Sequence, residues 1–124
     1  MLRSPFFFIL IILSFISCKE KITVSAKANN SKKVPKLIQE KAINELQKSN
    51  YNSAFYYFNK SKVTFESLKD SSNIVFNLLQ MATIQQINGD YYGSKETLTE
   101  ALPYIKKDDD YIAAINNLFG IADK

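Results

Sequence analysis

From Pro35 onwards, apolar residues recur three and four positions apart, which is the spacing of one face of an α-helix. The pattern predicts five helices, over about residues 35–48, 52–68, 72–88, 92–107 and 110–124. Between residues 25 and 35 the chain is rich in Ser, Asn and Lys and has no apolar period, which is typical of a flexible linker. We therefore expect an all-α domain that follows a tether.

Several residues mark where these helices should begin, end or break. Asn52 and either Ser71 or Ser72 are residue types that cap helix N-termini. Gly89 stands where a helix C-terminus favours a left-handed residue. Pro103 lies inside the fourth predicted helix, where it removes a backbone hydrogen bond, so we expect a kink or break near Leu102.

The apolar pattern repeats after about 40 residues, a period in the range typical of stacked repeats. The second and fourth predicted helices place small and large residues at the same steps, namely Ala54, Phe58, Ser61 and Phe65 against Ser94, Leu98, Ala101 and Ile105. The other three helices share a small residue at Ala42, Ala82 and Ala122. Stacked repeats bury their faces against their neighbours. The expected repeats cover about residues 35–70 and 71–109, with a partial third at 110–124.

The segment Asn88-Gly89-Asp90-Tyr91, followed by Ser94, Leu98 and Ala101, resembles the tetratricopeptide repeat (TPR). The resemblance implies an α-solenoid of antiparallel helix pairs whose first helices line a groove that binds a protein or peptide. The groove residues it implies are Gln39, Ile43, Leu46, Phe76, Leu79, Thr83, Gln86, Asn116 and Phe119. The period is longer than the roughly 34 residues usual in that family, and an unrelated helical bundle remains the alternative.

The N-terminus has the parts of a secretory signal: Arg3, an apolar run over residues 6–16, and the small Ser17 before Cys18. The apolar run is too short for a membrane-spanning helix, which needs roughly 20 residues. Phe15-Ile16-Ser17-Cys18 resembles the lipobox of bacterial lipoproteins, although Phe15 departs from the usual Leu. The resemblance implies a signal peptide over residues 1–17, an acylated Cys18, and a lipid-anchored Lys-rich linker over residues 18–34. An ordinary signal peptide with an incidental cysteine is the alternative.

The positive charge is concentrated in the expected linker. Residues 19–36 contain six lysines and one glutamate, a net charge of +5, whereas residues 37–124 contain nine lysines and eleven acidic residues, a net charge of −2. A nucleic-acid-binding domain is expected to carry its basic patch on the folded surface, so we expect no nucleic-acid partner.

Catalytic and metal-binding motifs are absent from the sequence. The chain has no histidine, and its single cysteine excludes an internal disulfide. The Asp108-Asp109-Asp110 run lacks the spacing and glycine of a calcium loop, so we interpret it as favouring a helix N-terminus. We expect no enzyme activity, metal or cofactor.

These patterns predict a lipid-anchored module of the bacterial cell envelope, with the outer membrane as its expected location, that binds a protein or peptide. The alternative is the N-terminal sensory region of a signalling protein, such as a histidine kinase or transcriptional regulator. Two helix pairs and one unpaired helix make a short array, so we also expect the chain to be part of a longer one.

Overall fold

The computed structural model describes residues 30–106 and 111–123, and Lys33–Lys124 forms one compact unit. The expected signal peptide, Cys18 and the Asp108-Asp109-Asp110 run lie outside the described residues. Helix covers residues 30–47, which we call the N-terminal helix, and is followed by α2 (Tyr51–Ser67), α3 (Ser71–Ile87) and α4 (Tyr91–Ala101). A short 3₁₀ helix, η1 (Leu102–Tyr104), and α5 (Tyr111–Ala122) complete the fold.

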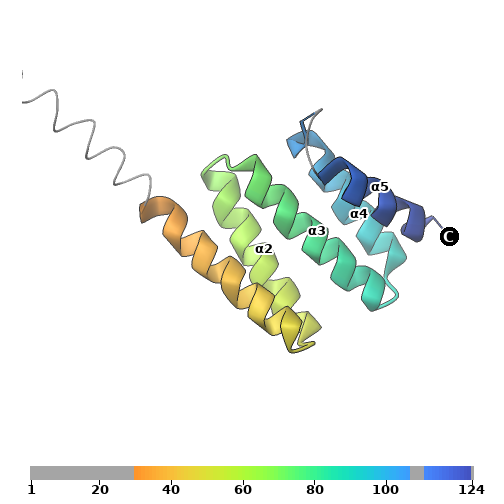
Figure 1. Cartoon of the computed structure of the whole chain (residues 1–124), viewed down its shortest axis with the longest axis horizontal. Coiled ribbons are helices and arrows are strands. Elements are labelled where there is room, and N and C mark those ends of the chain that lie inside the picture. The colour runs from red at the N-terminus through yellow and green to blue at the C-terminus, as the bar shows by residue number, and fades with distance from the viewer. Residues whose placement is uncertain (1–29, 107–110, 124) are drawn as a thin grey trace, which may run out of the picture. The chain divides into compact units, whose positions relative to one another are not determined.

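The expected all-α class is confirmed: five helices pack consecutively, and the described residues contain no strand. Successive helices run in opposite directions (Figure 1). Alternate helices also touch. Gln39 of the N-terminal helix donates a hydrogen bond to Asn77 of α3, and Gln86 of α3 donates one to the Leu118 carbonyl of α5. The N-terminal helix, α3 and α5 thus form one row, and α2 and α4 form the second.

The three turns that precede α2, α3 and α4 have the same backbone geometry. Each contains one residue in the left-handed region, with φ of 61° at Ser49, 54° at Lys69 and 78° at Gly89. The next residue donates its N–H to the carbonyl five positions back, in the pairs Asn50–Glu45, Asp70–Phe65 and Asp90–Gln85. This is the Schellman motif, which satisfies the last carbonyls of a helix. The left-handed Gly89 is confirmed, and the motif recurs at equal intervals along the chain.

The helix N-termini differ from the predicted caps. Asp70 caps α3 through a hydrogen bond from the Asn73 N–H, so the assignment to Ser71 or Ser72 is wrong. The residue before α2 is Asn50, so Asn52 is not a cap either. Asn50 itself makes no capping bond, because its side-chain amide donates to Glu45 instead.

The break predicted at Pro103 is confirmed. Helix α4 ends at Ala101, and Leu102–Tyr104 tightens into the 3₁₀ helix η1. The fourth helix is therefore shorter than the pattern of apolar residues indicated, because Pro103 cannot donate the next backbone hydrogen bond.

The N-terminal helix extends beyond its predicted start. Residues 30–34 are helical, although we expected them in the linker. Pro35 lies inside the helix and is buried, and its carbonyl accepts a hydrogen bond from Ser61 of α2. The fixed φ of proline is compatible with a helix. The backbone N–H that Pro35 lacks therefore does not make the helix begin at this residue.

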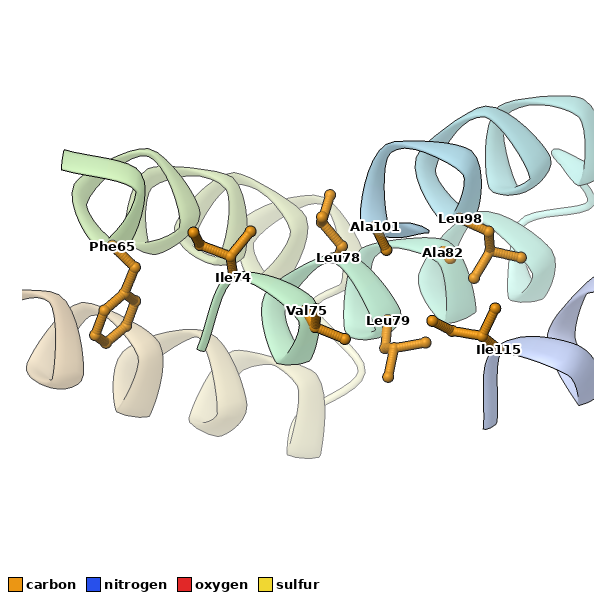
Figure 2. Close-up of a cluster of buried hydrophobic side chains, with 9 residues drawn as sticks. All are labelled: Phe65, Ile74, Val75, Leu78, Leu79, Ala82, Leu98, Ala101 and Ile115. Atoms are coloured by element: carbon orange, nitrogen blue, oxygen red, sulfur yellow. The ribbon is translucent and has the colours of Figure 1, made fainter. Parts of the chain in front are cut away.

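Two clusters of buried apolar side chains hold the helices together. One lies where the N-terminal helix, α2 and α3 meet and includes Ala42, Phe58 and Ile84. The other joins α2, α3, α4 and α5 around Leu78 and Leu98 (Figure 2). Burial of each large apolar side chain contributes about 1.5–3 kcal/mol relative to its exposure.

Residues one repeat apart occupy similar surroundings through most of the domain. The pairs Ala42 and Ala82, Ala54 and Ser94, Phe58 and Leu98, and Ser61 and Ala101 are all fully buried. Pro35, Val75 and Ile115 are buried as well. The correspondence weakens in α5, where Leu118 and Ala122 are half-buried although Leu78 and Ala82 are not exposed at all. The offset in the sequence therefore corresponds to a repeated packing position.

Candidate binding face

Helix α3 is central to the fold, and one stripe of its surface remains open. It contacts the N-terminal helix and α2 on one side and α4, η1 and α5 on the other. The stripe consists of Phe76, Gln80 and Thr83, which are half-buried, and Ile87, which is 53% exposed. Steps of four, three and four residues place these side chains on one face of the helix.

The period of the repeat extends this stripe to the neighbouring helices of the same row. The corresponding positions are Lys36, Glu40, Ile43 and Gln47 on the N-terminal helix, and Asn116, Gly120 and Asp123 on α5. All are exposed except Ile43, which is half-buried. Together with the α3 stripe they form what we call the open face: Lys36, Glu40, Ile43, Gln47, Phe76, Gln80, Thr83, Ile87, Asn116, Gly120 and Asp123.

The open face has an apolar middle and a polar surround. Ile43, Phe76 and Ile87 supply the apolar area, and the Phe76 ring packs edge to face on Phe58 with centroids 6.3 Å apart. Amide and hydroxyl side chains make up half of the remaining eight residues, three others are charged, and a Cβ added at Gly120 would have no atom within 4 Å. An open helical surface of this composition suits an apolar side chain of a partner, with amides available for its backbone.

The predicted groove residues divide into three groups. Ile43, Phe76, Thr83 and Asn116 belong to the open face. Leu46, Gln86 and Phe119 are half-buried, and they pack or hydrogen-bond against neighbouring helices. Gln39 and Leu79 are only 5% and 6% exposed, so their assignment to an accessible groove is wrong.

Gln39 belongs instead to a chain of buried hydrogen bonds between helices. Its side-chain amide donates to Asn77 Oδ1 at 3.2 Å, and Asn77 Nδ2 donates to Ser61 Oγ at 3.2 Å. The Ser61 hydroxyl then donates to the Pro35 carbonyl at 3.0 Å. Every buried polar side-chain atom in the described residues has a partner. This network joins the N-terminal helix, α2 and α3.

Gln80 and Ile87 are open-face residues that the prediction missed. The available signal was the step of four from Phe76 and again from Thr83 along α3. The prediction used Leu79 and Gln86 instead. Each is one position earlier, which turns a side chain by about 100° around the helix axis.

A polar depression of about 530 Å³ lies beside the first turn and includes Glu45, Asn50, Ser53 and Asn88. The Asn50 amide lies 2.9 Å from a Glu45 carboxylate oxygen and lowers the pKa of that carboxyl group. Tyr57 of α2 raises the pKa of Lys41 on the N-terminal helix. The Lys41 ammonium group lies 4.4 Å from the centre of the tyrosine ring. These interactions connect the turn and α2 to the N-terminal helix and leave both ionisable groups charged at neutral pH.

Within residues 30–106 and 111–123, no group of three side chains is arranged to hold a metal ion. None of the helices in those ranges is both long enough and apolar enough to span a membrane. Comparisons with family models, with curated proteins and with solved structures found no match to this chain.

Proposed function

We propose that this protein is a non-catalytic, lipid-anchored module of the bacterial cell envelope that binds a protein or peptide on its open face. In this proposal the five helices are a short TPR-like solenoid, and acylated Cys18 tethers it through the preceding segment. The open face carries the proposal, because equivalent positions on three helices of one row are exposed or half-buried, and the N-terminal helix and α3 contribute apolar side chains to it.

The repeated packing supports the solenoid. Helix pairs that stack with a constant offset present equivalent side chains in rows, and such rows form extended binding surfaces in repeat proteins. Here the row Lys36, Phe76 and Asn116 crosses the face at one level, and the row Glu40, Gln80 and Gly120 crosses it at the next. Position-by-position variation along such rows is a means of specificity.

The chemistry of the face favours a largely uncharged segment. Its central helix contributes no ionisable group, and the charged residues Lys36, Glu40 and Asp123 lie on the outer two helices. A short amphipathic helix or an extended strand could place one large apolar side chain beside Phe76 and Ile87. Its backbone would meet Gln80 and Asn116.

The test is a matched pair of substitutions on exposed asparagines. Asn116→Arg introduces a bulky charge on the open face, and Asn59→Arg makes the same change on α2, in the other row. The tagged full chain and both variants are used to capture partners from envelope extract, and captured proteins are quantified by mass spectrometry. We expect Asn116→Arg to reduce a captured partner at least tenfold and Asn59→Arg to leave it unchanged, with both variants retaining their helicity. Equal capture by the two variants would place binding elsewhere.

A further inference from the structure

The N-terminal helix has a second uncovered surface, which we call the end face: Lys33, Val34, Leu37, Lys41 and Asn44. It faces away from the core clusters, whose members on this helix are Ala42, Ile43 and Leu46. Val34 and Leu37 are 58% and 55% exposed, although they are aliphatic side chains one helical turn apart. Isolated exposed apolar residues are common, but here two adjoin each other and lie among lysines.

In the second repeat, neighbouring helices cover the residues equivalent to the end face. The equivalent residues there are Ile74, Asn77, Met81 and Ile84, at 1%, 0%, 5% and 1% exposure, because the neighbouring helices cover them. Val34 is apolar like its equivalent Ile74, and Leu37 is apolar where its equivalent Asn77 is polar. Lys41 and Asn44 are polar at the positions of Met81 and Ile84. The end face is therefore apolar in its first half and polar in its second.

This division argues against a helix as the occupant. A helix that packed along the whole face, whether from this chain or from a second copy, would bury Lys41 and Asn44. Burying polar groups without enough hydrogen-bond partners opposes association, and covering Lys41 would take water from an ammonium group whose neighbour in the fold is the Tyr57 ring. The occupant must touch Val34 and Leu37 and leave the second half of the face in water.

Charge identifies that occupant. Residues 30–39 contain three lysines and no acidic residue, and Lys33 is exposed on the end face, next to Val34 in the sequence. Lysine side chains keep the ammonium group at a polar interface while their methylene stems cover apolar surface. Amphipathic helical turns with this combination lie in the headgroup region of anionic bilayers.

We propose that the first half of the end face docks on the surface of an anionic phospholipid bilayer, with Val34 and Leu37 inserted among the headgroups and Lys33 on a lipid phosphate. The inference rests on the proposed lipid anchor, since Cys18 precedes Lys33 by a short stretch of chain. A stretch of that length reaches at most about 50 Å, so an anchored molecule keeps this helix near the membrane. Docking then fixes how the open face is presented.

The absence of tryptophan from the chain allows a direct test. Leu37→Trp places a single fluorophore on the end face, and Val63→Trp places one on α2 at a position of nearly equal exposure, 54%. The full chain carrying either substitution is purified from membranes and reconstituted into vesicles of phosphatidylglycerol and brominated phosphatidylcholine. We expect strong quenching of the Leu37→Trp fluorophore, a blue shift of its emission, and neither change for Val63→Trp.

Two further arms separate the contributions. Replacing phosphatidylglycerol by phosphatidylcholine, or adding Lys33→Glu, should reduce the quenched fraction, by roughly fivefold in partitioning when Lys33 no longer meets a lipid phosphate. Equal quenching in zwitterionic vesicles would overturn the electrostatic docking. A blue shift of the Leu37→Trp emission in protein that also carries Cys18→Ser, in buffer without detergent or vesicles, would show that another part of the chain or a second copy covers the face. Flotation with vesicles without quenching would overturn docking and leave the lipid anchor intact. The Asn116→Arg capture experiment fails or succeeds independently of all these outcomes.

Discussion

Asn77 is the central member of a buried polar network, and its role follows from its two hydrogen bonds. Its carbonyl oxygen accepts from Gln39 on one helix, and its amide nitrogen donates to Ser61 on another. Asn77 and Ser61 are fully buried and Gln39 is only 5% exposed. If the Asn77 amide is removed, water therefore cannot replace it as the hydrogen-bond partner of Gln39 or Ser61. An unsatisfied buried polar group costs more than a hydrogen bond contributes, which makes the network a determinant of how the N-terminal helix is seated.

Asn77→Ala should lower the free energy of unfolding by about 1–3 kcal/mol, because it leaves the Gln39 amide and the Ser61 hydroxyl with fewer partners. The matched control is Asn117→Ala, which removes the same side chain at the exposed equivalent position of α5. A surface change of that kind should remain within about 0.5 kcal/mol of the wild-type value. Urea denaturation followed by circular dichroism measures both, and equal losses would contradict the buried network.

At the scale of the helices, the turns determine the regular spacing. Helices α2 and α3 each have 17 residues, and each of the first three turns places one residue in the left-handed region. Only Gly89 of those residues adopts that conformation without steric cost, whereas Ser49 and Lys69 carry a Cβ. Gly93 has a different task, since an added Cβ would collide with the capping carboxylate of Asp90 and with the Gln85 amide.

Two glycine substitutions should therefore have opposite signs. Gly89→Ala places a Cβ at φ of 78° and should destabilise the domain by about 1 kcal/mol. Gly120→Ala lies inside α5, where the added methyl meets no atom within 4 Å, and should stabilise it by about 0.4–1 kcal/mol. Thermal unfolding of both variants provides the comparison. A loss of stability in Gly120→Ala would indicate that this position is covered.

Most of the helices could be predicted from the sequence, because the spacing of apolar residues shows which segments are helical and Pro103 shows where one helix must break. The helix ends were harder to predict. Ser, Asn and Asp occur together in the turns, so residue type alone could not distinguish Asp70 from Ser71 as the N-cap. The sequence does not indicate the start at residue 30, because a proline such as Pro35 is typical of the first helical turn. Gln39 and Leu79 were predicted to be accessible but are buried. The burial of a helical residue depends on the direction from which the neighbouring helices pack, which the sequence does not give.

At the scale of the whole molecule, the two rows of helices determine where its surfaces lie. The ion pair between Lys62 of α2 and Glu100 of α4, at 2.5 Å, joins the two helices of the second row. The first row carries the open face and, at its N-terminal helix, the end face. A molecule attached through the segment before this helix would thus have its membrane-proximal and partner-binding surfaces on different sides of the same helix.

Cys18→Ser tests the attachment at this scale. If Cys18 carries the acyl chains, the substitution should move the protein from the membrane fraction to the soluble fraction and abolish labelling with palmitate, because about 0.8 kcal/mol of membrane affinity is lost with each buried methylene. Fractionation and immunoblotting of cells that express each form measure the shift. Undiminished membrane retention together with unlabelled wild-type protein would contradict acylation.

The similar geometry of the turns at Ser49 and Gly89 has a consequence for the addition of further repeats. Both turns have a left-handed residue followed by the same backbone hydrogen bond. A helix pair inserted between them, or removed, would therefore need no turn of another type. Duplication within the gene would then lengthen the recognition surface by one step at a time, and the register of side chains on either side would be preserved.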